Sequence, residues 1–110
     1  MQGVRNADST TAVDEVNLNI PNGFLLEQNY PNPFNPTTII NYNLREHGLV
    51  RLKIFDSLGR EVATLVNKIQ SAGSHTIEFD AAGINLASGT YIYQVDSGGF
   101  IQSRKMIFIR

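Results

Sequence analysis

Apolar and polar residues alternate along several short stretches of the sequence, and this two-residue period limits the possible folds more than any other feature. Successive side chains of a β-strand point to opposite faces, so such alternation marks a strand with one buried face. Turn-forming residues separate the stretches at short spacing, and no long segment shows helical spacing. The alternating stretches are residues 37–44, 50–55, 75–79 and 91–95. This pattern predicts an all-β fold.

Within each stretch the larger side chains share one face, which predicts the core. The residues on these faces are Thr38, Ile40, Tyr42, Leu44, Val50, Leu52, Ile54, His75, Ile77, Phe79, Tyr91, Tyr93 and Val95. The arm from Arg60 to Val66 is less regular, because Val62 and Leu65 are three positions apart, and a bulge or a short non-strand stretch is expected there. A final strand is expected over residues 100–109.

Two turns have the same chemistry, with an Asp at the first position and a Gly at the fourth. They are residues 56–59, where Gly59 closes a type I turn, and residues 96–99. Gly89 starts a later strand, and Tyr91 just after it resembles the tyrosine corner of immunoglobulin-like sandwiches, where the phenol bonds back to nearby backbone. These features predict an antiparallel immunoglobulin-like β-sandwich of about seven strands.

The composition changes near residue 23. All the aromatic residues, six Phe and four Tyr, lie in residues 24–110. Residues 1–23 have no large side chains whose burial would offset the entropy lost on ordering the backbone, so we expect a flexible linker there and one domain over residues 24–110. A second possibility is that the linker adds an edge strand through its apolar residues Val13, Val16, Leu18 and Ile20.

Charge and composition exclude several classes of protein. The net charge of −1 lacks the positive excess that binds nucleic acid, and no apolar run is long enough for a transmembrane segment. The absence of cysteine excludes a disulfide scaffold, a zinc ribbon and a thiol nucleophile.

Catalytic motifs are also missing from the sequence. The two histidines, His47 and His75, lie far apart without a neighbouring acidic cluster, which gives a zinc site little support. There is no GxSxG elbow, no phosphate-binding loop and no GxGxxG. Calcium held by backbone carbonyls would leave no spacing to detect. We therefore predict no enzyme activity, no metal-ligating residues and no cofactor, and whether an ion is bound stays open.

The most distinctive stretch, residues 28–38, contains three prolines. Pro31, Pro33 and Pro36 fix the φ angle, remove three backbone donors and restrict the residue before each of them to extended conformations. A central strand is excluded, and the stretch is expected to be a rigid connector.

Other side chains of this connector suggest how it is held. Tyr30 and Phe34 are expected to anchor it on the core. Asn32 and Asn35 are expected to form local hydrogen bonds, as asparagine does in turns.

Several motifs in residues 24–110 together resemble a known family, the C-terminal sorting domain (type A) of type IX secretion substrates. The motifs occur in a fixed order towards the end of the chain. They are Tyr30-Pro31-Asn32-Pro33-Phe34-Asn35-Pro36-Thr37-Thr38, Val50-Arg51-Leu52-Lys53-Ile54-Phe55-Asp56, Leu58-Gly59-Arg60-Glu61-Val62, Ala87-Ser88-Gly89-Thr90-Tyr91 and Arg104-Lys105-Met106.

The resemblance implies an immunoglobulin-like domain that acts as an address for a larger parent protein N-terminal to it. It also implies recognition by the type IX outer-membrane translocon, removal by a sortase-like peptidase, and export through the periplasm and outer membrane to the cell surface or the medium. An exposed linker before residue 24 suits a peptidase, which binds an extended chain.

The end of the chain is the part most expected to meet a partner. A strand buried on one face needs apolar residues only at alternate positions, but Met106 to Ile109 are apolar without interruption. Either this strand is buried on both faces or it has a second surface for a partner. The candidate translocon-recognition residues are Arg104, Lys105, Met106, Ile107, Phe108, Ile109 and Arg110. Recognition is expected by strand addition at an exposed edge or through the basic side chains.

A second functional class is an immunoglobulin-like accessory or carbohydrate-binding module of a secreted enzyme. Such a module requires a platform of exposed aromatic side chains, and the alternation predicts Phe55 as the only obvious outward aromatic residue.

Overall fold

A computed structural model describes residues 25–110 of the chain. Seven strands and one short 3₁₀ helix lie in this part of the chain. They are β2 (Leu25–Leu26), β3 (Thr37–Leu44), β4 (Gly48–Phe55), β5 (Glu61–Gln70), β6 (Gly73–Asp80), η3 (Ala81–Gly83), β7 (Gly89–Ser97) and β8 (Phe100–Phe108). The proposed linker over residues 1–23 lies outside the described residues.

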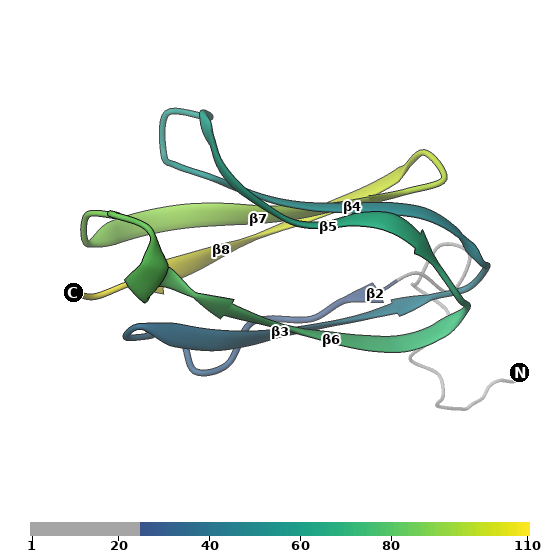
Figure 1. Cartoon of the computed structure of the whole chain (residues 1–110), viewed down its shortest axis with the longest axis horizontal. Coiled ribbons are helices and arrows are strands. Elements are labelled where there is room, and N and C mark those ends of the chain that lie inside the picture. Colours follow the sequence, from purple (N-terminus) through teal and green to yellow (C-terminus); the bar gives the residue numbers. More distant parts are fainter. Residues whose placement is uncertain (1–24) are drawn as a thin grey trace, which may run out of the picture.

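The strands form two antiparallel sheets that face each other (Figure 1). One sheet has the order β2-β3-β6 and the other has the order β5-β4-β7-β8. The connection after β6, which contains η3, carries the chain from the first sheet to the second. The prediction of an all-β antiparallel sandwich is confirmed.

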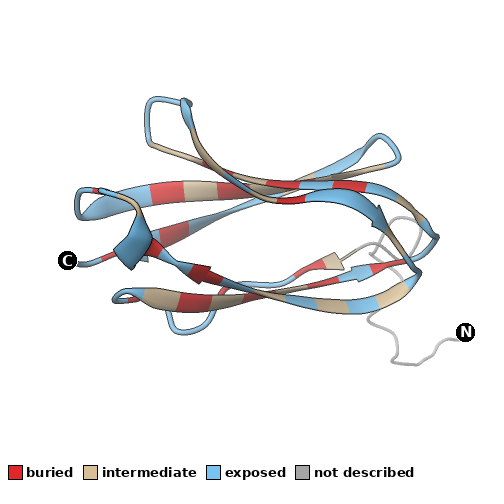
Figure 2. Ribbon diagram, viewed as in Figure 1, coloured by how far each residue is buried: buried red, intermediate tan, exposed pale blue. Residues whose placement is uncertain are grey.

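Buried residues occur on strands of both sheets (Figure 2), and their side chains form one hydrophobic core. On β3, β4 and β7 the buried side chains alternate with more exposed ones, as the two-residue period predicts. The largest fully buried side chains are Tyr42, Tyr93, Phe34, Leu26, Ile40, Leu52, Ile54, Met106, Val50, Val95 and Thr38.

The irregular arm expected after Arg60 is a bulged strand. Leu52 pairs with Val66 but the next residue of β4 pairs with Thr64, so Leu65 has no partner across the ladder. Val62 also has no partner across the ladder, because Ile54 pairs with Ala63 and the next residue, Phe55, pairs with Glu61. Both extra residues pack against the core, which explains their three-residue spacing. The strand itself continues to Gln70, beyond the predicted arm.

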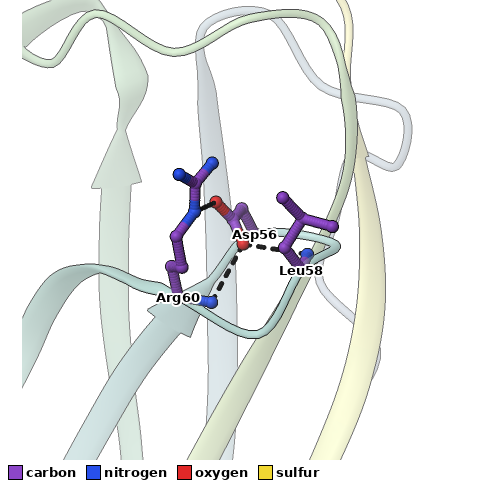
Figure 3. A network of polar contacts seen from close by, with 3 residues as sticks. All are labelled: Asp56, Leu58 and Arg60. Atoms are coloured by element: carbon purple, nitrogen blue, oxygen red, sulfur yellow. Dashed lines mark hydrogen bonds and ion pairs between the residues drawn. The ribbon is translucent and has the colours of Figure 1, made fainter.

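The turn between β4 and β5 is organised by the carboxylate of Asp56 (Figure 3). Asp56 Oδ1 accepts hydrogen bonds from the backbone N–H groups of Leu58 and Arg60, both at 2.9 Å. Its Oδ2 lies 2.8 Å from Arg60 Nε. Gly59 has a φ of 85°, which the absence of a Cβ permits. The Arg60 backbone N–H, followed by the other donors, holds the pKa of Asp56 below its usual value.

The resemblance of Tyr91 to a tyrosine corner is confirmed in its geometry. Gly89 opens β7 and the Tyr91 ring is buried. The Tyr91 hydroxyl donates a hydrogen bond of 2.6 Å to the backbone carbonyl of Ala87. This bond ties the connection between the sheets to the strand that follows it.

Replacing Tyr91 with Phe removes the hydroxyl that donates this hydrogen bond to the Ala87 carbonyl. We expect the free energy of unfolding to fall by about 0.5–1.5 kcal/mol, measured by urea denaturation. Tyr30→Phe is the matched control, because the Tyr30 side chain is exposed and its substitution is expected to change stability little. Equal effects of the two substitutions would contradict the role of the Tyr91 hydroxyl.

The lowered pKa of Asp56 predicts a pH-dependent contribution to stability. The folded state favours the carboxylate, so the unfolded state takes up the proton first as the pH falls, and the stabilisation is lost on acidification. The difference in thermal midpoint between the wild type and Asp56→Asn should be largest near neutral pH and should disappear in strong acid. A difference in thermal midpoint that stays constant with pH would contradict a stabilising role of the Asp56 carboxylate.

Candidate functional site

One side of the sandwich is closed by contacts between the segment Leu26–Phe34 and β8, which we call the seam. β2 and β8 are edge strands of the two different sheets. The seam therefore joins the beginning of the described chain to its last strand.

At one end of the seam, side chains of β8 bind the backbone of β2. The backbone N–H of Leu26 donates to Gln102 Oε1 at 2.8 Å. Arg104 Nε donates to the backbone carbonyl of Leu26 at 2.6 Å. Two side chains thus satisfy backbone groups of Leu26 in the way that a neighbouring strand does elsewhere.

Further along the seam, the proline-rich connector pairs directly with the backbone of β8. The N–H of Phe34 donates to the carbonyl of Ile107 at 2.9 Å, and the N–H of Ile109 donates to the carbonyl of Phe34 at 3.0 Å. This is a parallel bridge between Phe34 and Phe108. Gln28 Nε2 adds a bond of 2.8 Å to the carbonyl of Lys105.

Phe34 anchors the connector, as predicted. Its side chain is buried, with its ring centroid 5.2 Å from that of Phe108 and 5.9 Å from that of Phe79. The same prediction for Tyr30 is wrong, because its side chain is 78% exposed. Tyr30 forms an antiparallel bridge with Ile39, and partners in such a bridge point to the same face. Ile39 lies between inward-facing neighbours, so Tyr30 points outward with it.

The prediction of a local hydrogen bond for Asn32 is also wrong. Asn32 Oδ1 accepts a hydrogen bond of 2.9 Å from the backbone N–H of Ile107, a residue of β8. Asn35 and the three prolines of the connector are exposed. Asn35 and Pro36 line an open hollow of about 390 Å³ together with Phe108 and Arg110.

Sequence reasoning missed Asn29, a polar residue of the segment Leu26–Phe34 that is only 2% exposed. Asn29 Nδ2 donates to Thr38 Oγ1 at 2.9 Å and to the carbonyl of Pro31 at 3.1 Å. The Asn29 N–H donates to the hydroxyl of Tyr93 at 2.8 Å, and that hydroxyl donates to the carbonyl of Glu27 at 2.6 Å. Burial raises the pKa of the Tyr93 phenol above its ordinary value.

The candidate recognition residues lie in the second half of β8 and in the two residues after it, and they divide into two faces. Met106 and Phe108 are buried between the sheets. Ile107 and Ile109, at 42% and 50% exposure, lie on the outer face. The charged residues Arg104, Lys105 and Arg110 are exposed, although Arg104 also makes the internal bond to Leu26. The apolar run therefore combines a core face with an exposed apolar face.

The described part of the chain brings no catalytic set together. Residues 25–110 hold no cluster of three or more His, Asp or Glu side chains placed to bind a metal. His75 stacks on Tyr42 at a centroid distance of 5.5 Å, and its Nε2 lies 2.7 Å from the carbonyl of Ser71. His47 lies in the loop between β3 and β4, and no hydrogen bond or ring contact found in residues 25–110 joins it to His75. In residues 25–110 no helix is long and apolar enough to span a bilayer.

The expectation that Phe55 is the only outward aromatic residue is wrong. Phe55 is half-buried, whereas Tyr30 and Phe100 are more exposed, at 78% and 44%. The alternation did not identify them because Tyr30 lies in the connector and Phe100 lies at the start of a strand. These three residues come from three separate elements, and no ring contact found in residues 25–110 joins any two of them.

Comparison with known proteins identifies the family. The family profile of the secretion system C-terminal sorting domain matches residues 28–110. The chain belongs to this family, whose members are C-terminal signals of type IX secretion. The match includes both sides of the seam from Gln28 onward. A search of curated proteins gives no match.

A solved structure supports the fold. The chain is similar to part of PorZ of Porphyromonas gingivalis, described as an essential bacterial surface component of the type IX secretion system, with a TM-score of 0.54 and 20% sequence identity. The similarity covers 82% of this chain but only 12% of the PorZ chain. At this identity the likeness concerns the fold alone.

The two aromatic residues of the connector provide a test of the seam. Phe34→Ala leaves a cavity between Phe79 and Phe108, and we expect the free energy of unfolding to fall by about 3–5 kcal/mol in urea denaturation. Tyr30→Ala, in the same motif but exposed, is expected to change it by less than about 0.5 kcal/mol. A small effect of Phe34→Ala would show that the connector is not an anchor of the sandwich.

Proposed function

We propose that this domain is a non-catalytic address that directs a larger parent protein through the type IX outer-membrane translocon to the cell surface or the medium. The observation that carries the proposal is the family match over residues 28–110. The sandwich provides a stable body, and the outer face of β8 provides a surface for a receptor.

The exposed apolar side chains at the end of β8 and just after it support a role in recognition. Ile107 and Ile109 are exposed, and the exposed basic residues Lys105 and Arg110 flank them in the sequence. Apolar groups flanked by charges are typical of binding surfaces. Burial of the apolar groups stabilises the complex, and the charged groups add specificity. We infer that the translocon reads this face of residues 104–110 through its side chains.

After export, the domain is removed from its parent protein. A sortase-like peptidase cuts the chain before residue 24, where the absence of aromatic residues suits an extended substrate. The domain then serves as a signal that is discarded, and the parent protein is attached to the surface or released.

A reporter experiment tests the address. The 110-residue chain is fused to the C-terminus of a periplasmic reporter in a bacterium with a type IX system. We expect the reporter on the surface or in the medium, and in the periplasm when the translocon is deleted. Retention in the periplasm in both strains would contradict the proposal.

Point substitutions test the surface better than truncation does, because removing residues 104–110 also removes Met106 and Phe108 from the core. We expect Ile107→Lys with Ile109→Lys to lower export about tenfold or more, as for the loss of a binding hot spot, without loss of folding. Leu49→Lys with Ile69→Lys is the matched control, because this cross-strand pair is exposed on β4 and β5, away from β8. Normal export of the β8 variant would overturn recognition through this face.

A further inference from the structure

The two edges of the four-stranded sheet differ in how they are protected. β5 carries two bulges, which disturb its pairing and blunt the edge. β8 pairs with β7 through nine consecutive residues without a bulge, so it is a long and regular edge strand. Such an edge invites pairing with another chain unless something covers it.

The connector covers this edge between Lys105 and Ile109. In a strand, backbone groups of alternate residues point to the same side. The carbonyl of Lys105, both backbone groups of Ile107 and the N–H of Ile109 all bind residues of the connector. Two of these four bonds are made by the side chains of Gln28 and Asn32, and the other two by the backbone of Phe34.

The connector also differs from an ordinary added strand. Pro31 and Pro33 have no N–H group, so the connector offers few donors to any further strand on its outer side. It therefore ends the sheet instead of extending it.

We propose that the segment Gln28–Phe34 is an edge guard. It occupies the place on β8 where a strand of another molecule would pair. β8 therefore accepts such a strand only after the segment has detached from it. The guard is a property of the folded chain alone and does not depend on the proposed function. Side-chain recognition of Ile107 and Ile109 needs no such displacement, because their side chains are already exposed.

The structure also defines the strand that fits the vacated edge. It runs parallel to β8, as the bridge between Phe34 and Phe108 does. It has an aromatic side chain at the position of Phe34, which fills the space between Phe79 and Phe108. A strand with a small side chain there would leave this space empty.

Amide hydrogen exchange of the 110-residue chain tests the guard. Asn32→Ala removes the acceptor of the Ile107 N–H, and we expect exchange of this amide to become about twofold to tenfold faster, the range that corresponds to one net hydrogen bond. The amides of Met106 and Phe108 point towards β7 and should keep their rates. Asn32→Asp keeps an acceptor oxygen and Asn67→Ala changes an exposed residue of β5, so neither should affect Ile107.

Complementation tests the predicted partner. A peptide of residues 28–38 is added to the Phe34→Ala variant, whose guard lacks its aromatic side chain. We expect the thermal midpoint to rise with peptide concentration, because the peptide binds only the folded state. The same peptide with Phe34 replaced by Ala should have no effect, and neither peptide should shift the wild type.

Three results would overturn the proposal. The first is an unchanged Ile107 rate in Asn32→Ala. The second is a uniform increase over all of β8, which would mean that Asn32 contributes only to overall stability. The third is equal stabilisation of Phe34→Ala by both peptides. If Phe34→Ala does not fold, the exchange experiment decides alone.

Discussion

The burial of Phe34 is the contact on which the closed sandwich depends. Its ring lies against Phe79 on β6 and against Phe108 on β8, and these strands belong to different sheets. One side chain from an irregular connector therefore joins both layers. Its backbone pairs with β8 at the same point, so packing and hydrogen bonding position the connector together.

Beside this apolar contact lies a polar one. The Asn29 side chain donates a hydrogen bond to the carbonyl of Pro31, and the hydroxyl of Tyr93 accepts one from the Asn29 N–H and donates one to the carbonyl of Glu27. A buried polar network of this kind is tolerated only when its members are satisfied, and it then fixes one arrangement of the chain. The proline-rich motif is thus held on its inner side by Asn29 and on β8 by Asn32.

The strands and most of their buried faces were predictable because alternation is a local signal, as at Ile40 and Tyr42. The three-residue spacing of Val62 and Leu65 even indicated the bulges, since an extra residue in a strand shifts the period. The seam was not predictable. Asn32 bonds to a residue of the last strand, and no local pattern reveals such a partner. Tyr30 and Phe34 both look like anchors in the sequence, and their different backbone bridges, to Ile39 and to Phe108, distinguish them in the structure.

The seam also has a consequence for the order of events at the ribosome. β8 is synthesised after the other strands of residues 25–110, yet it supplies Met106 and Phe108 to the core and partners to Leu26 and Phe34. Contacts between residues so distant in sequence form late, because the intervening chain must first be brought together. A chain that stops short of β8 cannot close its two layers. The closed sandwich therefore forms only after β8 has been synthesised.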